Sequence, residues 1–266
     1  MEAEIVDRHQ MSTVFAAQRE NRLALKTTTP KQRVGRLRSL RDEILRRAEE
    51  IDAALHSDLR KMKAGVDNPE IRSVIYDIDD AIAGLAQWMA PTLVKPSAHL
   101  RGNTTHIRYE PRGVVLLLGP WNFPFALIFS PLVPIIAAGN ACIIKPSEMQ
   151  PKVSGIVHEI ISAVFKENEV ACFEGGIATA EALQDLPFDQ VFFTGSPAVG
   201  KRVMAAAARH LSSVTLELGG KCPAIIDSHY SLEDAAKKSA APASLTLGNF
   251  AWPWITYEFH ARVWRN

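Results

Sequence analysis

Cysteine is scarce in this 266-residue chain, and its three cysteines are widely spaced. Cys142, Cys172 and Cys222 show neither a paired nor a metal-type spacing, so the sequence predicts no disulfide framework and no metal site. Free thiols are typical of a reducing compartment. The first ten residues, "MEAEIVDRHQ", also lack the apolar stretch of a secretory signal. We therefore expect a cytoplasmic protein.

An excess of either charge is missing as well, since 30 Lys and Arg residues oppose 29 Asp and Glu residues. This balance gives no electrostatic reason to expect nucleic acid or an anionic membrane as a partner. Residues 113–144 contain no charged side chain and are long enough to suggest a membrane span. Four prolines, Pro120, Pro124, Pro131 and Pro134, would break such a helix. We predict a buried core and no transmembrane segment.

The pattern of apolar residues changes along the chain. Residues 1–97 are predicted to form an N-terminal helical part, in which residues such as Leu37, Leu40 and Ile44 recur at helical spacing up to about Trp88. The stretch that follows, "APTLVKPSAHLRGN", is expected to be a proline-bearing connection. Within 98–111, "TTHIRYEP" alternates like an exposed strand. Residues 112–227 alternate short apolar runs with amphipathic helices.

The apolar runs of 112–227 are bounded by glycine, proline or polar residues, as buried strands are. Five of them are expected to be strands: "GVVLLLG", "ACIIKPSE", "ACFEGG", "QVFFTG" and "SSVTLELGG". Strands that alternate with helices predict an α/β fold with a doubly wound, Rossmann-like parallel sheet.

Four turns follow the predicted strands at the edge where such sheets bind ligands: "GPWNFP", "KPSE", "TGSPAVG" and "ELGGK". In "TGSPAVG", Ser196 is an expected N-cap with Pro197 after it, so the helix N-terminus could take a diphosphate. Gly200 would allow close packing of helix and strand. An ordinary capped turn explains the same residues.

The other three turns also have two explanations each. Lys145 and Glu148 could contact ribose hydroxyls or form a surface ion pair. The amide of Asn122 could face a developing oxyanion or satisfy its own turn. Glu217, before Gly219 and Gly220, could be a general base or a salt-bridge partner.

Taken together, "PWNFPF", "AAGNACIIKPSE", "FFTGSPAVGK" and "VTLELGGK" resemble the aldehyde dehydrogenase superfamily, and most closely its class 3 branch of fatty and aromatic aldehyde dehydrogenases. The resemblance runs from the N-terminal helices to about Lys238. It implies a family fold in which a catalytic domain follows the cofactor domain.

The resemblance also implies a chemistry, in which an aldehyde is oxidised to an acid with NAD or NADP through a cysteine thiohemiacetal and thioester. In this comparison Asn122 matches the oxyanion amide and Glu217 the base that activates water. The positions that match cofactor contacts are Trp121, Lys145, Glu148, Thr194, Gly195, Ser196 and Gly200. The segment "TTHIRYEP" matches part of a hairpin through which family members form homodimers.

The nucleophilic cysteine of the family is missing from its expected register, which falls near Phe250 and Ala251. No cysteine follows Cys222, and Cys222 matches a packed strand next to Lys221. We interpret Cys222 as a bystander.

Residues 228–266 are interpreted as the start of a catalytic domain followed by an aberrant tail. If the tail codons are read from their third base, Trp252 before Pro253 must give alanine and Trp254 before Ile255 must give aspartate. The third base of Phe250 then permits cysteine. We therefore hypothesise a frameshifted, C-terminally truncated aldehyde dehydrogenase, with the shift after about Lys238.

Three functions remain open: an impaired dehydrogenase, a non-catalytic nucleotide-binding module, and a fragment that binds nothing. A carboxylate at Glu148 would repel a 2′-phosphate, which favours NAD over NADP.

Overall fold

A computed structural model describes residues 6–220, 226–227 and 229–237 of the chain. The chain divides into two compact units, Met1–Leu218 and Gly219–Asn266. The first unit contains the helices and the sheet described below. The predicted nucleotide-binding region, 112–227, therefore runs past the end of the first unit, and its boundaries stay a prediction.

Four long helices occupy the N-terminal part, as the apolar periodicity predicted: α1 Arg8–Lys26, α2 Pro30–Arg46, α3 Ala48–Leu59 and α4 Pro69–Trp88. Their ends have local causes. Thr29 and Gln32 form a capping box at the start of α2, and Asn68 caps α4 by accepting from the backbone N–H of Glu70. Short 3-10 turns, η1 Gly65–Asp67 and η2 Ala98–Leu100, precede and follow α4.

The central sheet has the five predicted strands: β3 Val114–Leu118, β4 Ala141–Lys145, β5 Val170–Cys172, β6 Gln190–Gly195 and β7 Ser213–Leu218. They lie in the order β5-β4-β3-β6-β7, and every neighbouring pair is parallel. The chain thus moves outward from β3 to one edge and then returns to build the other edge. This order confirms the predicted doubly wound α/β fold.

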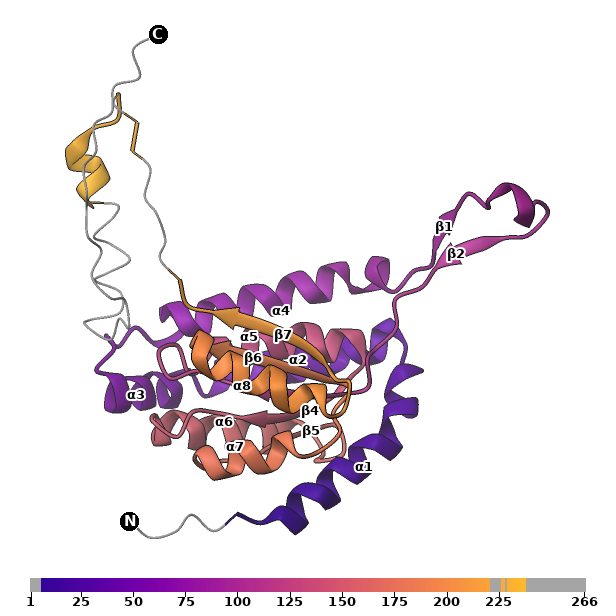
Figure 1. Cartoon of the computed structure of the whole chain (residues 1–266). Coiled ribbons are helices and arrows are strands. Elements are labelled where there is room, and N and C mark those ends of the chain that lie inside the picture. Colours follow the sequence, from indigo (N-terminus) through magenta and orange to yellow (C-terminus); the bar gives the residue numbers. More distant parts are fainter. Residues whose placement is uncertain (1–5, 221–225, 228, 238–266) are drawn as a thin grey trace. The chain divides into compact units, whose positions relative to one another are not determined.

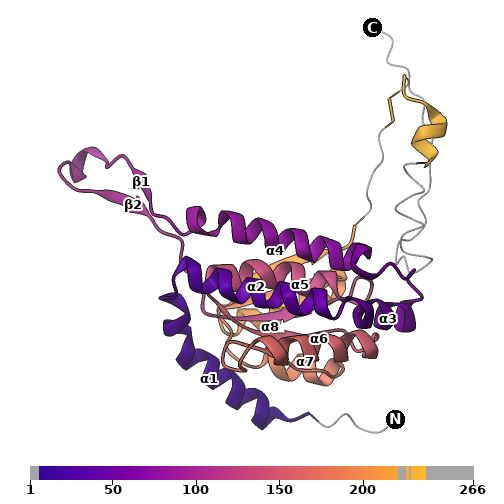
Figure 2. The ribbon, with the colours of Figure 1, turned by 180° about the vertical axis from the view of Figure 1, so that it is seen from behind.

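Four helices connect these strands and cover both faces of the sheet (Figure 1): α5 Ala126–Ala138, α6 Pro151–Val164, α7 Ile177–Gln184 and α8 Pro197–Ala208. Alternate residues of each strand enter opposite layers. Val115 and Leu117 of β3 pack into the layer of α2 to α6, whereas Leu116 packs into the layer of α1, α7 and α8. Figure 2 shows α2, α4 and α5 together on the first of these faces. Burial on both faces explains why β3, β4 and β5 read as unbroken apolar runs, whereas β6 and the edge strand β7 are only partly buried.

A two-stranded antiparallel hairpin projects from the body between α4 and β3 (Figure 1). Its second strand, β2 Thr105–Ile107, lies inside the predicted segment "TTHIRYEP" but ends before Pro111. Its first strand, β1 Thr92–Val94, lies in a stretch that we had predicted to be a connection only. That prediction was wrong because residues 92–94 become a strand only by pairing with β2, which lies more than ten residues later in the chain. Their local sequence does not indicate a strand.

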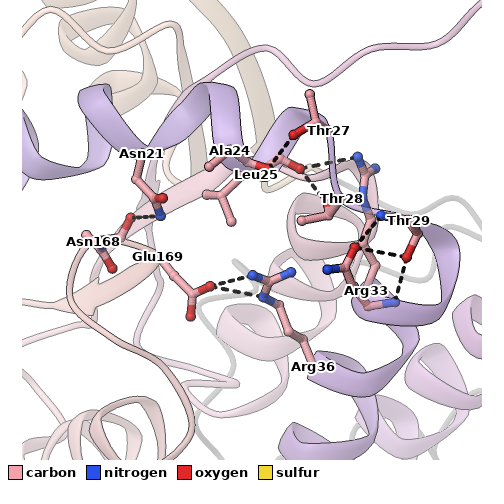
Figure 3. A network of polar contacts seen from close by, with 11 residues as sticks. Asn21, Ala24, Leu25, Thr27, Thr28, Thr29, Arg33, Arg36, Asn168 and Glu169 are labelled. Atoms are coloured by element: carbon pink, nitrogen blue, oxygen red, sulfur yellow. Dashed lines mark hydrogen bonds and ion pairs between the residues drawn. The ribbon is translucent and has the colours of Figure 1, made fainter.

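A buried arginine, Arg33, lies against Gly139 just before β4, at the amino edge of the sheet and thus opposite to the predicted ligand edge. Figure 3 shows its polar contacts. Arg33 donates to the carbonyls of Ala137 and Lys26, and to the hydroxyl of Thr28. Burial, and secondarily the charge of Arg36, lowers the pKa of Arg33. Arg36 in turn pairs with Glu169, just before β5, and so this cluster joins the α1–α2 corner to the sheet.

The second unit is described only in part, and residues 232–237 within it are helical. Lys221, Cys222 and the tail after Lys237 lie outside the described residues, so the structure does not bear on Cys222 or on the predicted change of frame. Among the described residues, no helix is both long enough and apolar enough to cross a membrane.

Candidate functional site

Three of the predicted turns, and Glu217 at the start of the fourth, come together at the carboxyl edge of the sheet. Leu118 of β3 is in register with Lys145 of β4 and with Phe193 of β6, and Thr194 of β6 is in register with Glu217 of β7. The turns that follow these strands therefore share one edge. Strand order reverses between β3 and β6, and doubly wound sheets bind their ligands at such a switch point.

The Asn122 turn, residues 119–125, lies on one side of this switch point. Trp121 and Asn122 are half-buried there, between Gly119 at the strand end and the fully buried ring of Phe125. The backbone carbonyl of Asn122 accepts a hydrogen bond from Nζ of Lys61 at 2.8 Å. Within the described part of the chain, its side-chain amide has no hydrogen-bond partner, so the amide is available to a ligand.

Lys145 and Glu148, the two predicted ribose contacts, form an ion pair with 2.7 Å between Nζ and Oε2. The side chain of Lys145 is only 6% exposed, whereas that of Glu148 is 45% exposed. The pair is therefore more than a surface contact, because its cation is buried at the end of β4. It places one donor group and one partly exposed carboxylate at the ligand edge, which is a suitable combination for hydroxyl groups.

The turn from β6 to α8 has the predicted local form. Ser196 is the N-cap, with its hydroxyl accepting from the N–H of Val199 at 3.3 Å, and Pro197 occupies the first helical position. A Cβ at Gly195 would lie 2.4 Å from the ring of Phe193, so no side chain fits at the strand end without a shift. The first turn of α8 is exposed, which leaves its N–H groups and partial positive charge open to an anion.

Gly200, one turn into α8, provides the close approach of helix to strand that we predicted. A Cβ there would lie 3.0 Å from a methyl group of Leu218 and 3.5 Å from one of Leu216, both on β7. The backbone N–H of Gly200 donates to the carbonyl of Ser196, which closes the first turn of the helix. Because Gly200 has no side chain, the start of α8 can lie against the strand that carries Glu217.

Glu217 lies near the end of β7 with an exposed side chain. Among the described residues it has neither an ion pair nor a hydrogen bond to its carboxylate. Within the described part of the chain, Glu217 therefore does not form the strand-end salt bridge that was the alternative explanation. An exposed, unpaired carboxylate at the ligand edge can act as a base toward water.

The two described cysteines are unsuited to nucleophilic chemistry. Cys142 on β4 and Cys172 on β5 are both buried in the sheet and have free thiols. Burial raises the pKa of both thiols far above the usual range, and the neighbouring thiol or the carboxylate of Glu174 raises it further. Each stays a neutral thiol at physiological pH and serves as a small apolar side chain in the core.

Sequence reasoning missed two residues that support the Asn122 turn, Lys61 and Glu70. Lys61 lies in the basic stretch after α3, and Glu70 occupies the first turn of α4, where acidic residues are common for local reasons. Nothing in their local sequence separates them from surface charges. The structure shows both buried, with residue exposures of 7% and 2%.

Comparisons with known proteins identify relatives of this chain. The profile of the family described as "Aldehyde dehydrogenase family" matches residues 2–252, so the match continues past Lys238, where we expected the resemblance to end. AldX of Bacillus subtilis (strain 168), named as an aldehyde dehydrogenase, is 45% identical over 248 residues, which are 93% of this chain and 55% of AldX. Aldehyde dehydrogenase family 3 member A2 of Macaca fascicularis is 38% identical over 77% of this chain and 42% of its own length.

Solved structures give the same result. The substrate-bound state of AldH from Staphylococcus aureus superimposes with a TM-score of 0.83 at 36% identity, over 87% of this chain and 50% of that chain. The chain thus spans about half the length of the curated relatives and solved structures that it matches.

Proposed function

Because this chain belongs to the aldehyde dehydrogenase family, we propose that its first unit binds NAD at the carboxyl edge of the sheet and serves the oxidation of an aldehyde to a carboxylic acid. The observation that carries the proposal is the meeting of three polar turns and Glu217 at one edge, beside the point where strand order reverses between β3 and β6. Relatives named as aldehyde dehydrogenases support the same substrate class.

The residues at this edge fit a dinucleotide. The open N-terminus of α8, with Ser196 as its cap, would hold the diphosphate, and the small residues Gly195 and Gly200 keep strand and helix close to it. Lys145 and Glu148 would hold the ribose hydroxyls. The carboxylate of Glu148 favours NAD over NADP because it would repel a 2′-phosphate. When bound, the nicotinamide supplies the hydride acceptor of the reaction.

The two remaining roles concern the aldehyde. The unpaired amide of Asn122 would donate to the oxyanion that develops from the aldehyde oxygen, a contribution that costs no rearrangement if the amide is already in place. The unpaired carboxylate of Glu217 would accept a proton from the water that releases the acid. Both groups lie at the ends of strands of one sheet, as a shared site requires.

Homodimer formation through the hairpin belongs to the same proposal. The hairpin exposes apolar side chains, including Leu93 at 74%, Ile107 at 48% and Tyr109 at 79% of their surface. Apolar side chains on a projecting hairpin are typical of a surface that another subunit covers.

Calorimetric titration of the 266-residue chain with NAD tests the binding proposal. We expect saturable binding, and we expect the variant Lys145→Met to raise the Kd about tenfold through loss of one charge-assisted contact. Arg36→Met, which removes an ion pair at the opposite edge, is the matched control and should leave the Kd unchanged. A chain that takes up no NAD would be a fragment without this function.

Turnover separates a dehydrogenase from a nucleotide-binding module. The 266 residues contain no cysteine after Cys222, and the described Cys142 and Cys172 are buried. We therefore expect no steady NADH formation from benzaldehyde or hexanal, even where NAD binds. A steady rise in absorbance at 340 nm, with a turnover rate on the order of that of typical enzymes, would show that the chain does contain a catalytic nucleophile.

A further inference from the structure

Lys61 and Glu70 form a buried ion pair behind the Asn122 turn. The side chains are 9% and 2% exposed, and Nζ of Lys61 is in direct contact with Oε1 of Glu70. Removing two charges from water is costly, and a pair so placed is retained only where its remaining hydrogen-bonding groups also find partners. In this pair those partners all belong to the Asn122 turn and the helix that follows it.

Lys61 uses its ammonium group to hold the turn itself. Nζ donates to the backbone carbonyl of Asn122 at 2.8 Å, and it also lies 4.1 Å from the centre of the Phe123 ring. A lysine over an aromatic face is attracted by the ring's negative face. Two successive residues of the turn are thus attached to one cation.

Glu70 holds the other end of the turn. Its Oε2 accepts from the backbone N–H groups of Phe125 and Ala126, each at 3.0 Å, where α5 begins. The N-cap position of α5, Phe125, has no side chain able to accept these bonds. A carboxylate from α4 therefore caps α5 in place of a local residue, and it is favoured there by the helix dipole.

The pair is itself positioned by α3 and the start of α4. Asp52 accepts from the backbone N–H groups of Ala64 and Gly65 and from the side chain of Asn68, and Asn68 accepts from the N–H of Glu70. This chain of hydrogen bonds fixes the loop that carries Lys61 to the helix that carries Glu70. The N-terminal helices are in this way connected to the ligand edge of the sheet.

We propose that Lys61 and Glu70 are positioning residues that hold the Asn122 turn in its ligand-ready geometry, so that Trp121 and the amide of Asn122 are preorganised. The expected effect on NAD binding rests on the proposed function, whereas the position of the Asn122 turn can be measured without NAD. A group held in place before binding loses less freedom when the ligand arrives, which is the source of the expected gain in affinity.

The test uses Lys61→Met in the full chain, with amide hydrogen exchange at Phe125 and Ala126, the side-chain amide NMR signal of Asn122, and NAD titration. Loss of Lys61 should speed exchange at both backbone amides, shift the Asn122 signal, and raise the Kd for NAD about tenfold, the effect of one charge-assisted hydrogen bond. Arg36→Met again serves as control, because it breaks a partly buried ion pair at the other edge, and it should change none of the three.

Lys61→Met also leaves the carboxylate of Glu70 buried without its cation, and the chain could fail to fold for that reason alone. The double variant Lys61→Met with Glu70→Gln removes this charge, while the carbonyl of the new side chain still accepts from Phe125 and Ala126. Thermal stability should then recover relative to Lys61→Met, but the carbonyl of Asn122 stays without its donor. The Kd for NAD should remain raised about tenfold, since the turn that carries Trp121 and Asn122 still lacks the hydrogen bond that holds it in place.

A purely structural role predicts that affinity recovers together with stability in the double variant, and that outcome would overturn the proposal. Unchanged exchange and an unchanged Asn122 signal in Lys61→Met would overturn it as well. If the wild-type chain binds no NAD, the proposed function fails, whereas the exchange and NMR measurements still decide whether Lys61 and Glu70 hold the turn.

Discussion

At the scale of single residues, two glycines of this chain differ in whether a side chain could replace their hydrogen. Gly139 ends α5 in the left-handed region with φ of 87°, and a Cβ there would lie 2.6 Å from the guanidinium of Arg33. Gly35 lies within α2 with open space around it. Glycine and asparagine are residue types that commonly end a helix, but only the packing of Arg33 shows why no side chain is tolerated at Gly139.

These two glycines make a matched pair of alanine substitutions. Gly139→Ala should lower the free energy of unfolding by about 2 kcal/mol or more, through strain at positive φ and contact with Arg33. Gly35→Ala should raise it by about 0.5–1 kcal/mol, because alanine favours a helix interior. Urea unfolding followed by circular dichroism measures both, and equal effects of the two variants would contradict this explanation.

At the scale of elements, the corner between α2 and α3 is tied to α6 by one acidic residue and one arginine. Glu43 of α2 accepts from Arg46 and Arg47, and Arg47 also contacts Glu159 of α6. The hydrogen bond from Arg46 is the largest cause that lowers the pKa of Glu43, with Arg47 adding to it, to about 2 from an ordinary value of 4.5. Glu43 is well shielded, with 14% of its side chain exposed.

A lowered carboxyl pKa stabilises the fold above the pKa of the unfolded chain, and the contribution disappears as pH falls toward the folded value. Glu43→Gln should therefore cost about 1–2 kcal/mol near pH 7. The difference from wild type should shrink as pH falls from about 4.5 toward 2. Glu50→Gln is the control. Glu50 is more exposed and, among the described residues, forms an ion pair with Arg47 alone, so its substitution should change the free energy of unfolding by less than about 0.5 kcal/mol. Urea unfolding at several pH values measures the differences, and a pH-independent cost for Glu43→Gln would count against the ion pair as its cause.

The elements themselves were largely predictable. Five short apolar runs became the five strands of the sheet. The signal is strongest for β3, β4 and β5, which are buried throughout, whereas β6 and β7 were recognised by their β-branched and apolar residues before a glycine. The hairpin strand β1 was missed because three residues between connections have no such signal. Its pairing with β2, in which Thr92 lies opposite Ile107, is a contact between segments that local pattern does not reveal.

At the scale of the whole molecule, the sheet, three of the four turns, and Glu217 at the start of the fourth belong to one compact unit, Met1–Leu218. Trp121, Lys145, Glu148 and the turn at Ser196 are all within it. The second unit adds no residue to the proposed cofactor contacts, and so the first unit should keep the cofactor function.

A fragment of residues 1–218 should therefore unfold in a single cooperative transition and bind NAD with a Kd within about threefold of that of the full chain, which is less than about 0.7 kcal/mol. Calorimetric titration and thermal unfolding of both chains measure this. Loss of binding in a folded fragment would mean that residues after Leu218 contribute to the site, as the predicted boundary at 227 implies.

The sequence by itself determined the order of the helices and of the five strands of the central sheet along the chain, their parallel arrangement, and the residues of the turns at the carboxyl edge. These features follow from the spacing of apolar residues and from capping residues, which act over a few neighbouring positions. Only the tertiary structure decided that Lys61 and Glu70 lie behind Asn122, that the side chain of Lys145 is buried while that of Glu148 is partly exposed, and that Glu217 is unpaired. Lys61 is 61 positions from Asn122, and Glu70 is 55 from Phe125. Contacts between such distant segments depend on how whole helices pack on the sheet, which no local pattern records.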